Sequence, residues 1–302
     1  MRTQKKKNIK PRNNKGRILF KGIMLVLFLS GLITFSYLFL ADAVNDIHDQ
    51  LTIEKYQKDY SELNKHQKEE RLKKIQEDNK KLIENNKLTN IPGMGLVKDP
   101  FDEASKDTQE SGQKYLKAHM IGAIFIPKIK ISQPVFDTTN TMLLEKGVTL
   151  LQGTSFPIGG KGTHAVLTGH SGLPDKKIFT DLEKLRKGDM FYINVSGKKL
   201  AYRIKSFKKV LPDNIDDLTI EDDVDQVTLV TCTPYMVNTH RLLVTGVRVP
   251  YNEVKAEQGI KSTKDYHFYR VIILCILVAL ILLVLIYKAI RFIKSKSKMT
   301  KR

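Results

Sequence analysis

Three polar residues with the chemistry of a nucleophilic site stand near the ends of separate β-rich stretches. Cys232 ends one stretch, Arg241 opens the next, and His170 follows an earlier one, flanked by glycines. Catalysis by a cysteine needs a thiolate, a group that transfers protons and a donor that stabilises an oxyanion. We expect a cysteine at a strand end to be partly exposed, and a nearby guanidinium to favour its thiolate. The three residues meet these requirements if the strand ends converge.

The same residues also have an ordinary structural interpretation. Cys232 could be a buried core residue beside a surface arginine, and residues 226–249 alone do not separate the two possibilities. A single histidine is likewise more often an ordinary polar residue than a catalyst. The surrounding elements therefore have to decide.

The elements that would position these residues are short strands separated by glycine and proline. The predicted strands are residues 123–126, 131–135, 164–168, 190–195, 199–210, 226–231 and 241–249. Many short strands with turn signals between them predict a sandwich or a barrel. Pro234 and Asn238 interrupt the pattern between Cys232 and Arg241, which predicts a connecting loop there.

Two apolar segments flank the β-rich region, at residues 18–40 and 268–287. Each can cross a hydrocarbon core of about 30 Å. Eight Lys and Arg precede the first segment and seven follow the second, whereas all 32 acidic residues lie between residues 41 and 267. The positive-inside rule then places both termini in the cytoplasm and the middle of the chain outside. The net charge of +19 thus reflects membrane topology, and we expect no nucleic-acid partner.

The first apolar segment has a second interpretation. Residues 41–43 resemble a signal-peptide cleavage site, although the apolar run is longer than the roughly 7–15 residues of a typical signal peptide. We therefore expect an uncleaved transmembrane helix.

The number of cysteines favours a functional role for Cys232. The chain has two, and the other, Cys275, lies inside the second apolar segment. An outer domain with a single cysteine has no internal disulfide. A thiol kept in an oxidising setting needs a reason to be there.

Between the first apolar segment and the strands, the chain is strongly charged. Apolar residues recur at three- to five-residue intervals over residues 42–90, which predicts one or two amphipathic helices; a solvated spacer is the alternative. Pro92 and Gly93 end this pattern. The tripeptide Asp99, Pro100 and Phe101 follows, in a loop that the proline stiffens.

Here the sequence resembles a known family. The sequence TLVTC at residues 228–232, followed nine residues later by Arg241, is similar to the TLxTC…R signature of the sortases. These are membrane-anchored cysteine transpeptidases of Gram-positive bacteria. Residues 168–170 (TGH) match the histidine motif of the family, and the resemblance covers residues 122–249 in matching order. It implies a mostly β fold: a sortase-like closed β-barrel with short helices.

Further features resemble class C, the sortases that polymerise pilins. These are the second apolar segment, the helical N-terminal extension and the tripeptide at residues 99–101, which in that class belongs to a lid over the active site. The run from Cys232 to Arg241 is also similar to class C. It departs from the family at Met236, where a small residue, often glycine, is expected.

The resemblance implies a mechanism. Cys232 would attack the threonine carbonyl of an LPXTG-type sorting signal, His170 would transfer protons, and Arg241 would bind the substrate or the oxyanion. The acceptor would be a lysine amine of the next pilin subunit. No cofactor is needed, because the thioester conserves the energy of the cleaved bond. In the resting enzyme Asp99 would pair with Arg241, and Phe101 would cover Cys232.

The resemblance also divides the chain into segments. We expect a cytoplasmic basic tail (1–17), a transmembrane helix (18–40), a helical extension (41–91), a lid segment (92–110), a sortase barrel (111–250), a connector (251–267), a second transmembrane helix (268–287) and a basic tail (288–302). The partners expected are pilin subunits and the lipid bilayer, with the enzyme itself a monomer.

Some alternatives stay open. An acidic run could hold calcium, but a solvated loop is the favoured interpretation; its members are Asp213, Asp216, Asp217, Glu221, Asp222, Asp223 and Asp225. No metal site has convincing spacing. The chain could instead be a sortase that anchors surface proteins to peptidoglycan, or an inactive binding or scaffold protein on the same barrel.

Overall fold

The computed structural model describes residues 14–85, 112–212, 214 and 216–300. Within them, eight strands close into one barrel in the order β1-β2-β3-β4-β7-β8-β6-β5. Two neighbouring pairs are parallel, β2 with β3 and β4 with β7, and the others are antiparallel. The strands are β1 (Met120–Ile126), β2 (Ile131–Phe136), β3 (Val148–Leu150), β4 (Thr163–Thr168), β5 (Met190–Val195), β6 (Lys198–Val210), β7 (Asp225–Thr233) and β8 (His240–Val249).

The predicted closed barrel is therefore confirmed. Each of the seven predicted strands is present with ends that differ by at most three residues. β3 was not predicted, because three residues are too short for a period-two pattern to be recognised.

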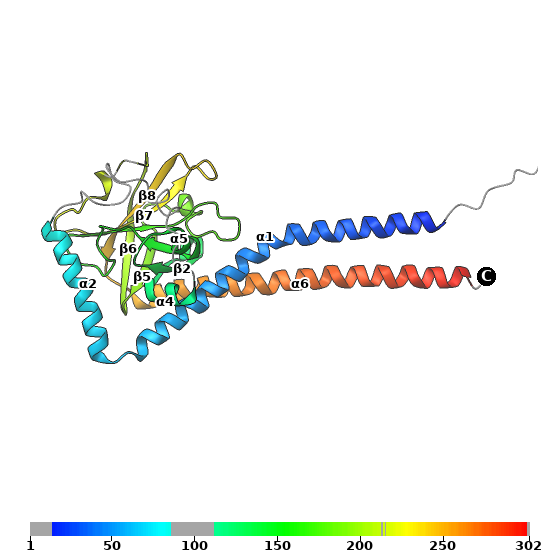
Figure 1. The fold of residues 1–302 in the computed structure, drawn as a ribbon, viewed down its shortest axis with the longest axis horizontal. Coiled ribbons are helices and arrows are strands. Elements are labelled where there is room, and N and C mark those ends of the chain that lie inside the picture. Colours follow the sequence, from blue (N-terminus) through cyan, green and yellow to red (C-terminus); the bar gives the residue numbers. More distant parts are fainter. Residues whose placement is uncertain (1–13, 86–111, 213, 215, 301–302) are drawn as a thin grey trace, which may run out of the picture.

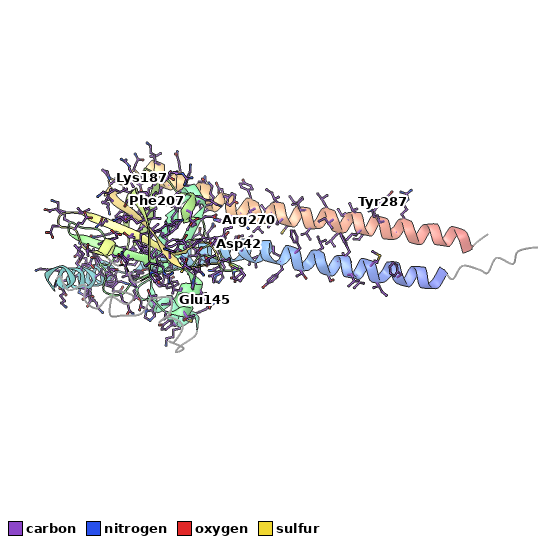
Figure 2. The ribbon with its side chains drawn as sticks, turned by 90° about the horizontal axis from the view of Figure 1, so that it is seen from above. Asp42, Glu145, Lys187, Phe207, Arg270 and Tyr287 are labelled. Carbon is purple, nitrogen blue, oxygen red and sulfur yellow. The ribbon has the colours of Figure 1, made fainter. Side chains whose placement is uncertain are left out.

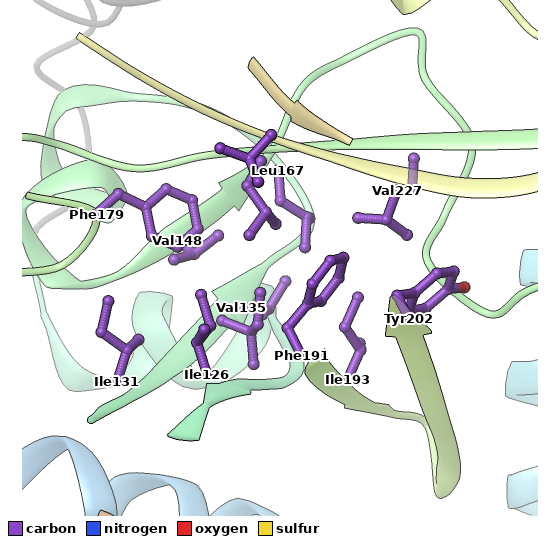
Figure 3. Close-up of a cluster of buried hydrophobic side chains, with 14 of the residues drawn as sticks. Ile126, Ile131, Val135, Val148, Leu167, Phe179, Phe191, Ile193, Tyr202 and Val227 are labelled. Atoms are coloured by element: carbon purple, nitrogen blue, oxygen red, sulfur yellow. The ribbon is translucent and has the colours of Figure 1, made fainter. Parts of the chain in front are cut away.

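The inside of the barrel is a packed apolar core (Figure 3). Phe191, Leu167 and Val227 are at most 1% exposed, and they come from three different strands. Burying a side chain of this size stabilises the fold by about 1.5–3 kcal/mol. The interior is therefore filled, and a substrate has to bind on the outside or at an end of the barrel.

Two long helices extend from the barrel side by side (Figure 1). They are α1 (Asn14–Glu62) and α6 (Glu253–Thr300). A second buried cluster joins them to the outer face of the barrel, through Ile53 of α1, Ala256 of α6 and Phe125 of β1. Every residue of β1 is buried, because one face of this strand meets the core and the other meets the helices.

The remaining helices are shorter than α1 and α6. They are α2 (Lys65–Asn85), α4 (Gln113–His119), α5 (Thr141–Lys146), η2 (Pro127–Ile129), η3 (Leu182–Lys184) and η4 (Asp216–Leu218). A capping box separates α1 from α2: the Gln67 backbone N–H donates to Asn64 Oδ1 at 2.9 Å, and the Asn64 N–H donates to Gln67 Oε1 at 3.1 Å.

α6 carries the predicted C-terminal span. Among the described residues, one helix, Glu253–Lys288, is long and apolar enough to cross a membrane, with a mean hydropathy of 3.2 in its most apolar window. Its apolar side chains are exposed in the isolated chain, as lipid-facing residues would be. In α1 the shorter apolar stretch Gly22–Leu32 lies within the predicted first span. The two-span topology therefore stays a prediction.

Where the helices meet the barrel, charged pairs hold them together. Arg270 of α6 contacts Asp42 of α1 at 2.6 Å and Asp46 at 3.3 Å, and Figure 2 shows Asp42 and Arg270 at this junction. Deeper in the protein, Lys176 Nζ donates to both oxygens of Asp49 at 2.7 and 2.8 Å and to the Lys146 carbonyl at 3.0 Å. Burial raises the pKa of Asp49, and Lys176 acts against that rise.

The Asp49–Lys176 pair gives the first prediction. Asp49 is 3% exposed and Lys176 is 8% exposed, so Asp49→Ala would leave a buried ammonium without its counter-ion. We expect the free energy of unfolding to fall by about 3–5 kcal/mol, measured by urea unfolding of the full chain in detergent. Replacing both residues, as Asp49→Leu with Lys176→Met, should recover most of the loss.

The control is Asp59→Ala, which removes an exposed partner of Lys117 and should change little. A similar small effect for Asp49→Ala would contradict the prediction.

Candidate active site

Cys232 and Arg241 lie directly opposite each other near the end of the β7–β8 ladder. Opposite residues of an antiparallel pair place their side chains on the same face, with Cβ atoms about 4.5–5.5 Å apart. The register of the sheet therefore makes the thiol and the guanidinium neighbours.

This face is the outer wall of the barrel. Along β7, Val227 and Leu229 belong to the interior core, whereas Val230 packs with Leu243 of β8 in a separate cluster. Because side chains alternate along a strand, Cys232 shares the outer face with Val230. Val230 and Leu243 form the next pair on this face, two residues along each strand from Cys232 and Arg241, and they pack together beside the site.

The expected partial exposure of Cys232 is wrong, because the thiol is buried, with 8% of the residue exposed. At this point β7 has a neighbouring segment along each edge. β8 pairs with it on one side as far as Thr233, and the chain that continues from β4 contacts it on the other. Both cysteines, Cys232 and Cys275, are thiols and not disulfide partners.

His170 reaches the site through the parallel β4–β7 pairing. The last register pair is Thr168 with Val230, and the contact continues beyond it. The Gly169 N–H donates to the Val230 carbonyl at 3.1 Å, and Thr231 Oγ1 donates to the Gly169 carbonyl at 2.7 Å. Two residues past Thr168 the register places His170 beside Cys232. The register thus pairs Cys232 with Arg241 and leads the chain after β4 towards the same end of β7.

The chain after His170 folds back against it. The Phe179 N–H donates to the His170 carbonyl at 3.0 Å, and the Gly172 N–H donates to Thr180 Oγ1 at 3.0 Å. Gly169 must be small here, because a Cβ atom would come within 2.8 Å of the Phe179 ring and 2.9 Å of Ile178. These contacts fix the backbone that carries the imidazole.

The electrostatics of His170 come from burial and from one carboxylate. Burial lowers the pKa of His170, and the negative charge of Glu145 opposes that change. The balance favours a neutral imidazole near neutral pH, which can accept a proton. Glu145 lies in α5, and no pattern in the sequence connects it with the histidine.

The Arg241 guanidinium is held by backbone carbonyls. Its Nη1 donates to the Asn238 carbonyl at 3.0 Å and to the His240 carbonyl at 3.1 Å. Burial lowers the pKa of Arg241 from its usual value. The side chain is 8% exposed, so its orientation is set by the protein.

The loop between β7 and β8 forms an exposed apolar rim. Its residues Tyr235, Met236 and Val237 are 57–70% exposed. Atoms of Tyr235 and Met236 would lie 3.4 Å from a Cβ atom at Gly172, so this rim borders the segment that follows His170. The Thr233–Pro234 bond in this loop is cis.

Glu183 of η3 supports the end of β7. Thr233 Oγ1 donates to Glu183 Oε1 at 2.5 Å, and this hydrogen bond is the main reason that the pKa of Glu183 is lowered. Thr233 follows Cys232 directly, so Glu183 helps to fix the strand at the site. The sequence analysis missed this residue, since η3 is 50 positions away along the chain.

The sequence analysis also considered a further histidine, a lid tripeptide and an acidic run. His164, at the opposite end of β4, is buried, and its ring contacts the Thr219 carbonyl and Thr228 Oγ1, both at 2.8 Å. Asp99, Pro100 and Phe101 lie outside the described residues. Within the described part of the acidic run, Asp225 accepts hydrogen bonds from Tyr202 and from the Gly160 N–H. Among the described residues no group of three or more His, Cys, Asp and Glu side chains could hold a metal ion.

Comparison with known proteins identifies the family. A model of the sortase domain matches residues 124–249, the segment that contains Cys232, His170 and Arg241. Sortase C1 of GBS pilus island 1 is 37% identical to this chain, and the match covers 68% of the chain and 94% of that structure with a TM-score of 0.57. The chain belongs to the sortase family. Sortase C of Streptococcus pneumoniae is 36% identical to this sortase, with 67% and 98% covered and a TM-score of 0.57.

Curated relatives match a shorter part of this sortase. Sortase A of Bacillus anthracis is 30% identical over 131 residues, which are 43% of this chain and 60% of that protein. This sortase spans about half to three fifths of the length of the first curated relatives that it matches. The predicted resemblance to sortases and to class C is confirmed.

A prediction follows for the histidine of this sortase. Glu145→Gln removes the negative charge that raises the pKa of His170, so we expect that pKa to fall further. NMR titration of histidine-labelled full chain would measure it. The control is Glu69→Gln on the exposed surface of α2, which should leave the titration unchanged. An unchanged or raised pKa in Glu145→Gln would contradict this description of the site.

A second prediction concerns the β7–β8 loop. Met236 has a φ of 64°, and this left-handed conformation costs about 1–2 kcal/mol for a residue with a side chain. Met236→Gly would relieve that strain, against an entropic cost of about 0.4–1 kcal/mol. Val237→Gly is the matched control. It carries the same entropic cost, but Val237 has no left-handed backbone strain to relieve. We expect Met236→Gly to be the more stable variant by about 1–2 kcal/mol in urea unfolding; equal stability would rule out the strain.

Proposed function

We propose that this sortase is a membrane-anchored cysteine transpeptidase that joins pilin subunits. Cys232 is the nucleophile, His170 transfers protons, and Arg241 donates hydrogen bonds to the substrate or the oxyanion. The observation that carries the proposal is the strand register, which pairs Cys232 with Arg241 and continues β4 to His170. A thiol, an imidazole and a guanidinium held on one face supply the three groups that acyl transfer through a thioester requires.

The reaction has two halves. In the first, the neutral His170 imidazole takes the proton of the Cys232 thiol, and Sγ attacks the threonine carbonyl of an LPXTG-type sorting signal. The peptide bond after the threonine breaks, and His170 gives a proton to the leaving amine. In the second half, a lysine amine of the next subunit attacks the thioester. The C–S bond breaks, an isopeptide bond forms, and His170 takes the proton from the amine. Arg241 stabilises the negative charge that develops on the carbonyl oxygen in both halves.

Pilin subunits are the favoured substrates because of the structural relatives. Sortase C1 of pilus island 1 is 37% identical over 68% of this chain, whereas sortase A of Bacillus anthracis is 30% identical over 43% of it. The apolar rim of Tyr235, Met236 and Val237 offers a surface for an extended peptide beside the thiol. Attachment of surface proteins to peptidoglycan is the alternative, and the sortase A relatives favour it.

The proposal includes the membrane topology of a Gram-positive cell-surface enzyme. α6 crosses the membrane and residues 18–40 form a second span. The basic residues before the first span and after the second keep both termini in the cytoplasm. The barrel then faces the cell wall, where its substrates are exported.

Transpeptidation tests the function. The full chain in detergent is incubated with an LPXTG-type peptide and a lysine-bearing acceptor peptide, and the joined product is measured by mass spectrometry. We expect Cys232→Ala to abolish joining and Arg241→Ala to reduce kcat by roughly 10²–10³-fold. Cys275→Ser, which removes the other thiol, should keep full activity. Product formed at the normal rate by Cys232→Ala would refute the mechanism.

A lid is the last part of the proposal. Asp99, Pro100 and Phe101 resemble the class C lid, with Asp99 pairing with Arg241 and Phe101 covering Cys232. In a Cys275→Ser background, Asp99→Ala with Phe101→Ala should make alkylation of Cys232 faster, because a lid must open before a reagent can enter. Replacing the exposed Lys73 and Lys74 by alanine is the control. Equal alkylation rates in the lid variant and the control would rule out the lid.

A further inference from the structure

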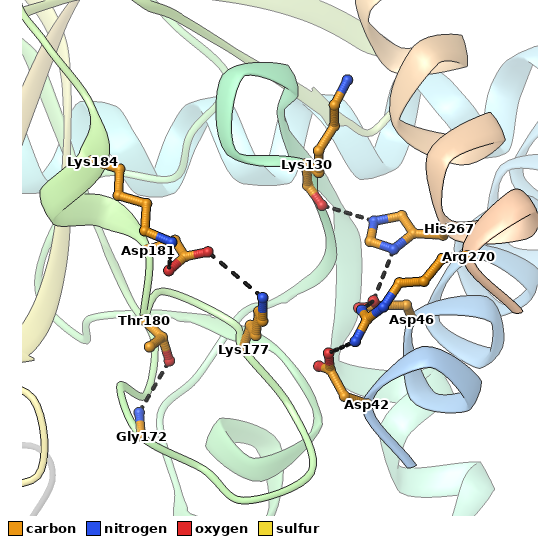
Figure 4. Close-up of polar contacts among 10 residues, drawn as sticks. All are labelled: Asp42, Asp46, Lys130, Gly172, Lys177, Thr180, Asp181, Lys184, His267 and Arg270. Carbon is orange, nitrogen blue, oxygen red and sulfur yellow. Dashed lines mark hydrogen bonds and ion pairs between the residues drawn. The ribbon is translucent and has the colours of Figure 1, made fainter. Parts of the chain in front are cut away.

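A pocket with a volume of about 300 Å³ lies where the barrel meets the two long helices. α6 contributes Tyr266, His267 and Arg270 to its wall, and α1 contributes Asp46. The opposite wall is the segment at residues 177–184, which continues from the loop after His170 (Figure 4). The pocket is separate from the active site and plays no part in the proposed reaction.

Basic side chains outnumber acidic ones around this pocket. The basic residues are Lys128, Lys130, Lys177, Lys184 and Arg270, and the acidic residues are Asp46 and Asp181. Lys184 lies 2.7 Å from Asp181, and Lys177 lies 3.9 Å from the same carboxylate. Two ammonium groups therefore share one carboxylate, and this wall keeps a net positive charge.

On the wall formed by α6 and α1, the charged groups pair with one another. Arg270 contacts both Asp42 and Asp46. His267 contacts Asp46 at 2.8 Å through Nδ1 and the Lys130 carbonyl at 2.7 Å through Nε2. These contacts fix α6 against α1 and η2, so the pocket keeps its shape. An anion entering it would be attracted to the wall formed by Lys177 and Lys184.

The sequence of α6 places this pocket at the level of the lipid headgroups. Arg270 is the last charged residue before an apolar run that continues to Tyr287. A charged residue followed by 17 residues without charge marks the boundary of the hydrocarbon core. Tyr266, which lines the pocket, and Tyr269 lie at the depth where tyrosine is enriched in membrane proteins. The phosphate groups of the adjacent leaflet lie at this same depth.

We propose that this pocket binds the phosphate group of an anionic phospholipid in the leaflet next to the barrel. Basic groups near such a surface each contribute about 1 kcal/mol of attraction, and the side chains of Lys177 and Lys184 are exposed at the pocket. A bound lipid would hold the barrel against the membrane at a point that the two helices do not supply. The inference rests on α6 crossing the membrane and is independent of the transpeptidase chemistry.

The test uses the full chain in a neutral detergent, freed of lipid. Phosphatidylglycerol and phosphatidylcholine with identical acyl chains are titrated, and bound lipid is counted by native mass spectrometry. We expect phosphatidylglycerol to bind more tightly, and inorganic phosphate at the same concentrations not to displace it. Equal binding of the two lipids would overturn the proposal, as would displacement by inorganic phosphate, which would assign the pocket to a free anion.

Substitutions test whether the lipid binds in this pocket. Lys177→Gln with Lys184→Gln should weaken phosphatidylglycerol binding roughly tenfold or more, since two basic groups are lost. The matched control is Lys73→Gln with Lys74→Gln on α2, which in Figure 1 lies on the side of the barrel away from the apolar part of α6. It should bind within about twofold of the parent. Asp181→Asn keeps both lysines, removes their shared counter-ion, and should strengthen binding. Equal weakening in the pocket variant and the control, or no change in all three, would refute the assignment.

Discussion

The pairing of β7 with its two neighbours is the constraint on which the site depends. A slip of one residue between β7 and β8 would turn Cys232 away from Arg241 and move Val227 and Leu229 out of the core. Loss of that apolar burial makes the slip unfavourable. The energy that packs the barrel interior is thus the same energy that holds the thiol opposite the guanidinium, and no separate contact is required to align them.

The parallel β4–β7 pair extends this constraint to the third group. Parallel strands need a long crossover connection, and the residues between β4 and β7 supply β5, β6 and η3. The segment just after β4 carries His170 and then folds back through Phe179 and Thr180. Lys176 in the same segment is anchored to Asp49 of α1. The backbone near the histidine is therefore tied both to β7 and to α1.

Much of this arrangement could be predicted from the sequence, for identifiable reasons. Alternating β-branched residues located β7 and β8, and the spacing of Cys232, Arg241 and His170 indicated a sortase, which the comparisons confirm.

Other features could not be predicted. β3, with three residues, was too short for an alternating pattern of apolar and polar residues to be recognised. Glu145 and Glu183 were missed because tertiary contact with His170 and Thr233 leaves no local signal. The Asp49–Lys176 pair joins positions 127 residues apart, and the burial of Cys232 depends on how the whole chain folds around it. Periodicity within one segment contains none of this information.

Acylation of the thiol is the most direct measurement of the central claim. The full chain would be incubated with an LPXTG-type peptide without an amine acceptor, and its intact mass would be recorded after rapid acid quench. We predict an added mass equal to the peptide up to and including the threonine, less one water, located on Cys232 by fragmentation and lost on treatment with hydroxylamine, which cleaves thioesters. The adduct should persist in Cys275→Ser and be absent in Cys232→Ala. Cleavage of the peptide by Cys232→Ala, or an adduct on another residue, would contradict the account.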